Sequence, residues 1–203
     1  MSHDFRYTSG RFQDHPHHYR QNQGNNSIIY MDNIVITPAT IQDKDALADL
    51  FYAHLSENVE YISHGEMQMG IGHLVFNGEE YVPQLDADSR HLWLIYIEEH
   101  MTTDGAAVFK AEDAAGKLLG FCVLETDSDG GAPFGVLCDI LVNAAARGRG
   151  VGGRLFAAAE DWFRHRGLKD VYLESGKNNH HAHEFFMRRG FMKVSEVYYK
   201  GGK

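Results

Sequence analysis

A segment rich in glycine and arginine has the residue types that bind phosphate groups. Its eight residues are Arg147, Gly148, Arg149, Gly150, Val151, Gly152, Gly153 and Arg154. Glycine lacks a Cβ atom, so the backbone can turn tightly and approach a ligand closely. A helix that begins at such a turn directs free N–H groups and the positive end of its dipole toward an anion. The arginines add fixed positive charge, so we expect a phosphate or pyrophosphate site here.

Two regular elements hold this segment in place. An apolar run over residues 135–142 predicts a strand that leads into the turn. After the turn, apolar residues recur at the spacing of a helix that packs on a sheet. These residues are Val151, Leu155, Ala158, Ala159 and Trp162. Positive charge near residue 165, followed by Gly167, predicts the end of this helix.

The remaining sequence predicts further strands and helices on both sides of the turn. Before it we expect a strand at 33–37, helices over 41–56 and 89–101, and strands at 106–111 and 118–125. After it we expect a strand at 170–174, a helix at 179–189 and a final strand or pair of strands at 191–200. Residues 57–88 give a poor signal, which predicts one short helix and a loop.

Composition limits the class of protein. The chain has 203 residues, of which 43% are hydrophobic, as in one soluble globular domain. Its net charge of −9 argues against nucleic-acid binding and suits cationic partners. Cys122 and Cys138 both lie in apolar runs and predict reduced thiols. No apolar run reaches the ~18–20 residues of a membrane span, and no secretory pattern opens the chain, so we expect a cytoplasmic protein without membrane contact.

The first part of the chain differs from the rest. Residues 1–30 are mostly polar and lack periodicity, which predicts a poorly ordered or partner-docking arm ahead of a single domain over 31–203. A metal site at His15, His17 and His18 is the alternative reading of the arm, but no cysteine or carboxylate pattern supports it. We therefore expect no metal.

Read alone, the glycine pattern is ambiguous. Gly148, Gly150 and Gly153 match the dinucleotide-binding fingerprint, and Glu174 follows at about the distance of its ribose-binding acid. Too little chain remains after the turn for the βα units of a dinucleotide domain, and the preceding strand belongs to an antiparallel series. A nucleotide-hydrolysing P-loop is excluded because no Gly-Lys-Ser/Thr follows.

Two motifs together resemble the GNAT N-acetyltransferase superfamily. Arg147, Gly150 and Gly152 match its acetyl-CoA pyrophosphate signature, Gln/Arg-x-x-Gly-x-Gly/Ala. The run from Asn179 to Phe191 is similar to its second signature, Asn-x-x-Ala-x-x-Phe-Tyr-x-x-x-Gly-Phe. The resemblance implies an α/β (α+β) acyl-CoA N-acyltransferase fold, with a mixed central sheet of about seven strands flanked by helices.

The resemblance also implies how acetyl-CoA, the co-substrate, is held. Amides of residues 149–153 would bind the pyrophosphate, and main-chain groups of 140–142 would bind the pantetheine arm as an added strand does. A backbone N–H near Leu141 would contact the thioester oxygen. The implied cofactor-binding residues are Ile140, Leu141, Val142, Arg147, Gly148, Arg149, Gly150, Val151, Gly152, Gly153, Asn179 and Phe186.

Catalysis is less well defined, because Phe186 replaces the tyrosine that is the usual general acid of the family. Tyr198 is our candidate replacement, and Asp139 and Glu125 are the candidate bases on the central strands. By strand alternation, Asp139 would share a face with Leu137 and Leu141. Further candidate acids are Tyr172, Tyr199 and His183.

The expected reaction is acetyl transfer to a primary amine of a small molecule or peptide by direct attack, and a homodimer is possible. Acidic residues between positions 79 and 88 suit a basic acceptor. The alternative is a non-catalytic acyl-CoA-binding or regulatory module, favoured by Phe186.

Overall fold

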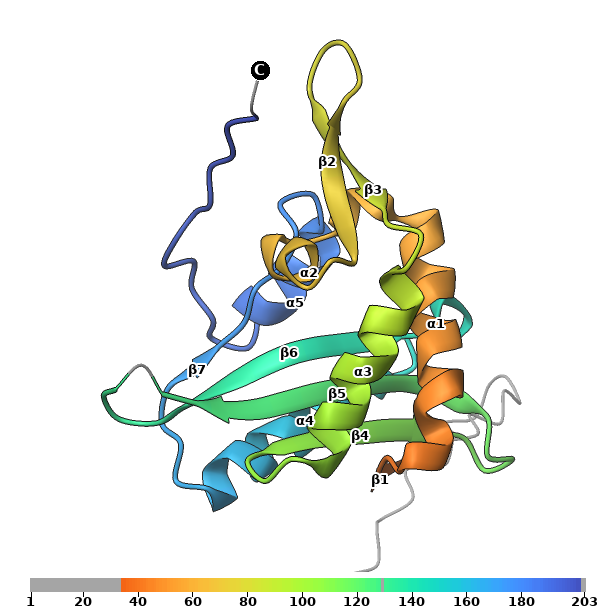
Figure 1. The fold of residues 1–203 in the computed structure, drawn as a ribbon. Coiled ribbons are helices and arrows are strands. Elements are labelled where there is room, and N and C mark those ends of the chain that lie inside the picture. Colours follow the sequence, from red (N-terminus) through yellow and green to blue (C-terminus); the bar gives the residue numbers. More distant parts are fainter. Residues whose placement is uncertain (1–33, 129, 202–203) are drawn as a thin grey trace, which may run out of the picture. The chain divides into compact units, whose positions relative to one another are not determined.

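A computed structural model describes residues 34–128 and 130–201 of the chain. The predicted arm, residues 1–30, lies outside this range. The described part forms a five-stranded sheet of order β1-β4-β5-β6-β7, together with a separate hairpin, β2–β3 (Figure 1). The sheet strands are β1 (Val35–Pro38), β4 (Ala106–Glu112), β5 (Leu118–Asp127), β6 (Phe134–Val142) and β7 (Val171–Tyr172). Only the β6–β7 pair is parallel, so the predicted mixed sheet is confirmed.

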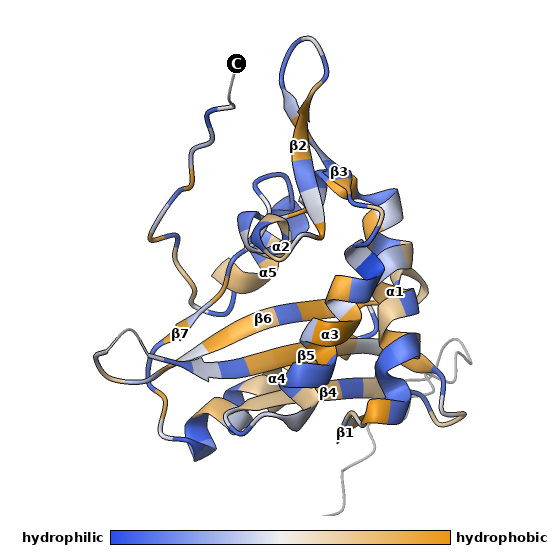
Figure 2. Ribbon diagram, in the orientation of Figure 1, coloured by the Kyte–Doolittle hydropathy of each residue, from blue (hydrophilic) through white to orange (hydrophobic). Residues whose placement is uncertain are grey.

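Helices cover both faces of this sheet. The helices are α1 (Lys44–Glu57), α2 (His64–Gln68), α3 (Ser89–Thr102), α4 (Val151–His165) and α5 (His180–Met187), with 3-10 turns at Ile41–Asp43, Val59–Tyr61 and Ala144–Ala146. One core lies between the sheet and α1 and α3, around the fully buried Trp93 and Phe121. A second core lies on the α4 side, around Leu155 and Phe163. Figure 2 shows the hydrophobic residues of β5 and β6 between these two layers.

The region over 57–88 is more ordered than the sequence predicted. It contains the turn Val59–Tyr61, helix α2, and an antiparallel hairpin of β2 (Gly72–Phe76) and β3 (Tyr81–Leu85). The side-chain oxygen of Asn77 accepts hydrogen bonds from the amides of Glu79 and Glu80, at 2.9 Å each, which closes the hairpin turn. The prediction of one helix and a loop therefore missed the hairpin.

The C-terminal prediction was also wrong. Residues 191–200 form no strand, although the sequence predicted one or two there. The predicted strand at 170–174 is likewise reduced to Val171–Tyr172, which pair with Gly135 and Val136. The central sheet therefore has five strands where the sequence predicted about seven, and the two hairpin strands are ones that the sequence did not predict. Within the described residues, no helix is long and apolar enough to cross a bilayer.

Candidate active site

The glycine turn has the geometry of an anion site. Gly148 and Gly150 adopt φ values of +75° and +84°, a left-handed conformation that L side chains rarely adopt. Gly150 is the N-cap of α4, and no side chain caps that helix end. The first intrahelical bond runs from Arg154 N to Gly150 O, so the amides of residues 151–153 have no acceptor within the helix. These amides and the dipole of a 15-residue helix favour an anion at the turn.

The arginines beside this turn point in different directions. Arg147 lies near Val142 O (Nε, 3.4 Å) and near Nδ1 of His54 (Nη2, 3.3 Å) at the end of α1. Burial, followed by the charge of Arg147, lowers the pKa of His54, which leaves the imidazole neutral and able to accept that bond. Arg154 donates to the carbonyl of Ile34 at 3.0 Å. The guanidinium groups of Arg147 and Arg154 thus have partners within the protein, and the backbone amides of residues 151–153 are the donors that lack an acceptor in the helix.

Strand β6 has an open edge next to this turn. Its pairing with β7 involves only Gly135 and Val136, while the strand continues to Val142. The amide of Asn143 donates to Leu119 O on the β5 side at 2.8 Å. By alternation, the N–H and C=O groups of Ile140 and Val142 then point away from β5, toward the open edge. An extended ligand can add there as a strand does.

The sequence predicted that a backbone N–H near Leu141 contacts the thioester oxygen, and the register of β5 with β6 limits which amide this can be. Leu141 pairs with Phe121, and its carbonyl faces β5 so closely that a Cβ on Gly120 would lie 2.4 Å from it. The backbone N–H and C=O groups of Leu141 therefore face β5 and not the open edge. At the open edge, the amide closest in sequence to Leu141 belongs to Ile140 or Val142.

Asp139 lies on the face of the sheet that α3 covers. Its Oδ2 accepts a 2.8 Å hydrogen bond from the hydroxyl of Tyr96 on α3. A β-bulge lies here, since Val123 pairs with Asp139 but Leu124 pairs with Leu137. The bulge breaks the alternation, so Asp139 shares its face with Leu141 as predicted but not with Leu137, which packs on the α4 side.

Glu66 on α2 is influenced by two other carboxylates, Asp139 and Glu174. Burial, followed by the charge of Asp139, raises the pKa of Glu66 on α2 from 4.5 to about 7. The charge of Glu174, which follows β7, acts on Glu66 in the same direction. Burial raises the pKa of Asp139 as well, although the hydrogen bond from Tyr96 opposes that shift. The three carboxylates form an acidic group that we call the acceptor triad: Glu66, Asp139 and Glu174.

Direct contacts fix α2 beside the segment after β7. The amide of Gly65 donates to Glu174 Oε1 at 2.9 Å, and the amide of Ser63 donates to Glu66 Oε2 at 2.6 Å. At Gly176 a Cβ would lie 2.0 Å from Tyr61 O, so only glycine allows this close approach. Two of the segments that carry the acceptor triad, α2 and the segment after β7, therefore pack against one another.

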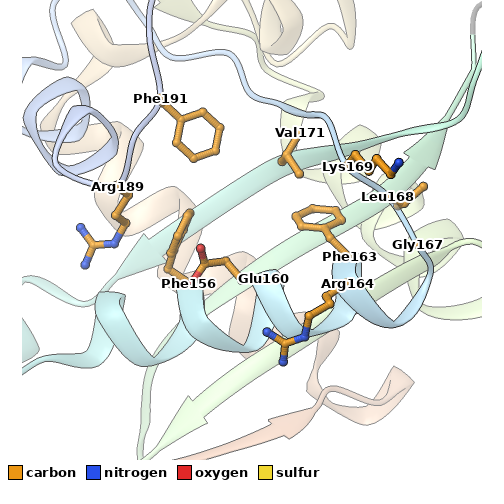
Figure 3. A pocket seen from close by; sticks show the side chains of 10 residues that line it. All are labelled: Phe156, Glu160, Phe163, Arg164, Gly167, Leu168, Lys169, Val171, Arg189 and Phe191. Carbon is orange, nitrogen blue, oxygen red and sulfur yellow. The ribbon is translucent and has the colours of Figure 1, made fainter.

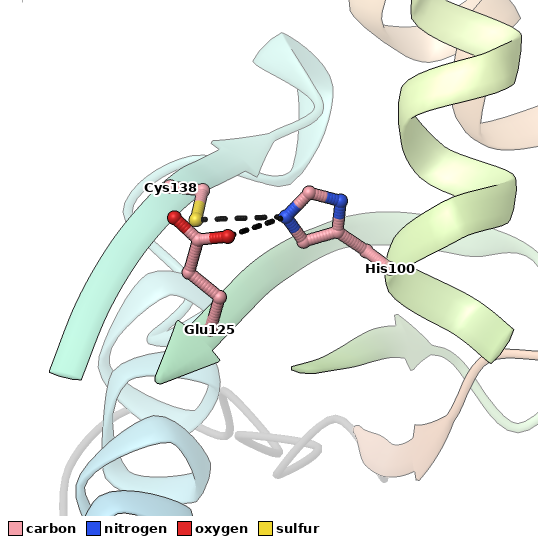
Figure 4. Close-up of side chains that lie close together, drawn as sticks. All are labelled: His100, Glu125 and Cys138. Carbon is pink, nitrogen blue, oxygen red and sulfur yellow. Dashed lines mark hydrogen bonds and ion pairs between the residues drawn. The ribbon is translucent and has the colours of Figure 1, made fainter. Parts of the chain in front are cut away.

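A second polar group lies further along the same face (Figure 4). His100 Nε2 on α3 is 3.2 Å from Glu125 Oε2 on β5 and 4.0 Å from Cys138 Sγ on β6. Its other ring nitrogen, Nδ1, lies 2.8 Å from the carbonyl of Tyr96. Burial lowers the pKa of His100, but its bonds to Glu125 and Tyr96 and the charge of Glu125 outweigh this, and the net shift is upward. The hydrogen bond from His100 lowers the pKa of Glu125.

The structure does not bring all of the predicted residues together. Tyr198 is 86% exposed on the C-terminal segment, where its hydroxyl donates to Glu196 Oε2 at 2.6 Å. No contact joins it to Asp139 or Glu125. Phe186 is 6% exposed and packs against Phe185 and Phe191. This burial explains how an aromatic ring without a hydroxyl fits that position.

Asn179 has a structural role at the start of α5. Its side-chain oxygen accepts a 3.2 Å hydrogen bond from the amide of Ala182, as an N-cap residue does. This contact occupies its acceptor atom. A role for Asn179 at the pantetheine arm stays a prediction, as do the other cofactor contacts.

Tyr96, His100 and Glu66 are site residues that the sequence did not identify. Tyr96 and His100 lie four residues apart on α3, on the side that faces the sheet, and both have polar partners there. Polar groups within the apolar stripe of a helix were the available signal. Glu66 gave no such signal, because it belongs to the short helix α2, in the region of poor periodicity.

A separate cavity of about 440 Å³ lies on the other side of the sheet (Figure 3). Its apolar wall includes Phe156, Phe163 and Leu168, which belong to the core on the α4 side. Arg164 and Arg189 lie at its margin. None of the acceptor triad lines it, so this cavity is distinct from the candidate active site.

Comparisons with solved structures show the same fold. A tetramutant of the BH1408 protein from Bacillus halodurans matches with a TM-score of 0.60 at 18% identity, over 82% of this chain and 99% of that one. An aminoglycoside 6'-N-acetyltransferase from Acinetobacter baumannii matches with a TM-score of 0.58 at 13% identity, over 84% and 99%. An aminoglycoside N-acetyltransferase solved with CoA matches with a TM-score of 0.58 at 19% identity, over 85% and 96%.

The sequence comparisons differ in what they find. No curated protein matches the chain. The sequence model of the Acetyltransferase (GNAT) family matches residues 74–191, more than half of the chain, and this range includes the open edge of β6, the glycine turn and α5. The fold, the turn geometry and this match agree, and the chain belongs to the GNAT acetyltransferase family.

Proposed function

We propose that the protein transfers an acetyl group from acetyl-CoA to a primary amine of a small, cationic molecule. The acceptor triad carries this proposal, because the charges of Asp139 on β6 and Glu174 after β7 both act on Glu66 on α2, which brings carboxylates of three segments together. Such a group attracts a cationic amine and repels anionic acceptors. Two of the neighbouring structures are aminoglycoside acetyltransferases, whose substrates bear several amines, and this supports the same class of acceptor.

Acetyl-CoA would bind along the glycine turn and β6. The pyrophosphate would contact the amides of residues 151–153, and the pantetheine arm would add to the open edge formed by Ile140 and Val142. A backbone N–H at that edge would donate to the thioester oxygen as negative charge develops on it. Holding both reactants in this geometry supplies much of the rate enhancement.

Glu66 is the proposed general base. Its raised pKa of about 7 lets the carboxylate accept a proton near neutral pH, where a carboxylate with an ordinary pKa is a weaker base. The ammonium form of the bound amine gives one proton to Glu66, directly or through a water molecule. The neutral nitrogen then forms the new C–N bond and releases its second proton to solvent. The C–S bond breaks, and the CoA thiolate leaves and takes a proton from solvent. Asp139 and Glu174 would hold the cationic acceptor during these steps.

A thiol-release assay over a panel of acceptors tests the proposal. The panel would contain polyamines, aminoglycosides, peptide N-termini and neutral hydroxyl analogues of equal size, each with acetyl-CoA. We expect thiol release above the rate without acceptor only for amines, with the greatest kcat/KM for acceptors that carry two or more positive charges. Binding of CoA without stimulation by any amine would instead support a non-catalytic acyl-CoA-binding module.

A further inference from the structure

We propose that His100, Glu125 and Cys138 form a binding site for a zinc ion. Their ligand atoms lie within 4.8 Å of one another. Among residues 34–128 and 130–201, this is the one group of three such side chains that converges in this way. The three come from α3, β5 and β6, so a bound ion would join the helix to two strands (Figure 4).

The hydrogen bonds of His100 orient it as a metal ligand. A carbonyl only accepts, so the 2.8 Å contact with Tyr96 O assigns the ring proton to Nδ1. In the neutral ring, Nε2 then carries a lone pair, and this lone pair faces the acceptor oxygen of Glu125 at 3.2 Å. Two facing acceptors require a cation between them or a proton on Nε2. Metal-binding histidines usually donate their other ring N–H to a carbonyl or carboxylate, as His100 does.

The spacing of the three atoms fits a small tetrahedral ion. Zinc bonds of about 2.0–2.3 Å to nitrogen, oxygen and sulfur place tetrahedral ligands about 3.4–3.6 Å apart. The His100–Glu125 and His100–Cys138 distances, 3.2 and 4.0 Å, lie on either side of that range. The third pair, Glu125 and Cys138, lies within 4.8 Å, so side-chain rotations must bring the ligands closer together for the ion to bind. The Glu125 side chain is 39% exposed, which leaves a path for the ion and for a water molecule as fourth ligand.

The donor set selects zinc over harder cations. A thiolate and an imidazole suit zinc, whereas magnesium and calcium prefer oxygen ligands. The thiolate and the carboxylate supply two negative charges, which balance Zn²⁺. The Sγ atom of Cys138 lies 3.7 Å from Val136 O. Coordination requires the thiolate, so the thiol proton passes to solvent when the ion binds.

A bound ion would also fix the acceptor side of the active site. His100 contacts the backbone of Tyr96, and the hydroxyl of Tyr96 contacts Asp139. Cys138 is the neighbour of Asp139 at the bulge in β6. Zinc would therefore hold α3 in the register that keeps Tyr96 on Asp139. This positioning role does not depend on acetyl transfer.

Cobalt substitution tests the site with a signal that requires a cysteine ligand. The full chain is stripped with a chelator and titrated with Co²⁺, and the sulfur-to-metal charge-transfer band is recorded. The other histidines of the chain, including those before residue 31, can bind metal but cannot produce this band. We expect a one-to-one endpoint, and displacement of the band by Zn²⁺.

The chain provides a matched control. Cys122 is its other cysteine, fully buried on the opposite face of β5. Cys122→Ser should keep the cobalt band, whereas Cys138→Ser should lose it. His100→Gln should weaken binding by at least about 100-fold, since loss of an outer-shell partner alone costs 10–100-fold. A band that survives Cys138→Ser, or that never appears in the unsubstituted protein, overturns the proposal.

Two measurements on the unsubstituted protein cover the case in which a variant fails to fold. Zn²⁺ should protect Cys138 from alkylation, as read by peptide mass spectrometry, and a chelator should remove the protection. At about 100 times its Kd, zinc should raise Tm by roughly 5–10 °C. Equal alkylation with and without zinc, together with an unchanged Tm, would show that a proton on His100 is the only cation at the site.

Discussion

The hydroxyl of Tyr96 donates a 2.8 Å hydrogen bond to Asp139 across the interface between α3 and β6. Burial raises the pKa of both groups, so each is costly to leave without its partner. The bulge at Cys138 turns Asp139 toward α3 and makes this contact possible. The β-bulge in β6 therefore determines where Asp139 lies in the proposed acceptor site.

Removal of the Tyr96 hydroxyl should destabilise the protein. In Tyr96→Phe, Asp139 loses its donor in a buried position, and we expect the free energy of unfolding to fall by about 1–3 kcal/mol. Tyr172→Phe, at a half-exposed ring, should change it by less than about 0.5 kcal/mol. Urea denaturation of both variants at pH 7 measures the difference. Equal midpoints for the two variants would show that the Tyr96 bond contributes nothing.

Glu66→Gln should separate activity from stability. The amide keeps an acceptor for the amide of Ser63 but cannot take a proton from the acceptor amine, so kcat should fall about 10²–10⁴-fold. Glu60→Gln, an exposed glutamate in the preceding turn, should retain full activity. If the two variants have the same kcat, Glu66 is not the base.

The stability of the protein should change with pH through Glu66. Its pKa is raised from 4.5 to about 7 on folding, so its protonated form stabilises the folded state. This contribution is complete below about pH 4.5 and is lost as the pH rises through about 7. Glu66→Gln should therefore have a higher Tm than the unsubstituted protein at pH 8, and the two values should converge at pH 5. A Tm difference between the two proteins that stays the same from pH 5 to pH 8 would contradict the raised pKa of Glu66.

The same pKa predicts how activity depends on pH. The carboxylate form of Glu66 is the active base, so kcat/KM should rise with pH and level off above about pH 7. The measurement uses saturating acetyl-CoA and an acceptor amine whose own pKa lies well outside the range. If kcat/KM does not change between pH 5.5 and 8, a group other than Glu66 accepts the proton of the amine.

Alanine at the N-cap of α4 should affect both the backbone and CoA binding. Gly150 has φ +84° and Gly116, in the turn between β4 and β5, has φ +77°, and a Cβ at either position meets nothing within 4 Å. Gly150→Ala and Gly116→Ala should thus each cost about 1–2 kcal/mol of stability. Only Gly150→Ala adds an atom where the pyrophosphate would approach, so only this variant should lose CoA affinity by calorimetry. Equal CoA affinity in both variants would show that the pyrophosphate does not bind at this turn.

Much of this site could be predicted from local patterns. The turn at Gly148 and Gly150, the start of α4 at Val151 and the helix after Asn179 each follow from residues that are close in sequence, and the structure confirms them. The hairpin turn at Asn77–Gly78 also had a local signal, since Asn-Gly strongly favours such turns, but the scattered apolar residues around it concealed the strands.

Other features depend on contacts between distant segments. The bulge at Cys138 arises from the pairing of β5 with β6, and strict alternation in β6 alone gave the wrong face for Leu137. The raised pKa of Glu66 comes first from its burial by other elements and then from the charge of Asp139, 73 positions later in the sequence. Tyr198 was chosen for its hydroxyl group, but nothing in its local sequence showed that its segment would be exposed.

Mass spectrometry of the acceptor after incubation with labelled acetyl-CoA tests the proposed function most directly. We predict one labelled acetyl group on a primary amine of a polycationic acceptor, formed in equal amount to free CoA, and loss of this product in Glu66→Gln. Free CoA that appears without any acetylated amine, or labelled acetate as the only product, would contradict amine acetylation as the activity of this protein.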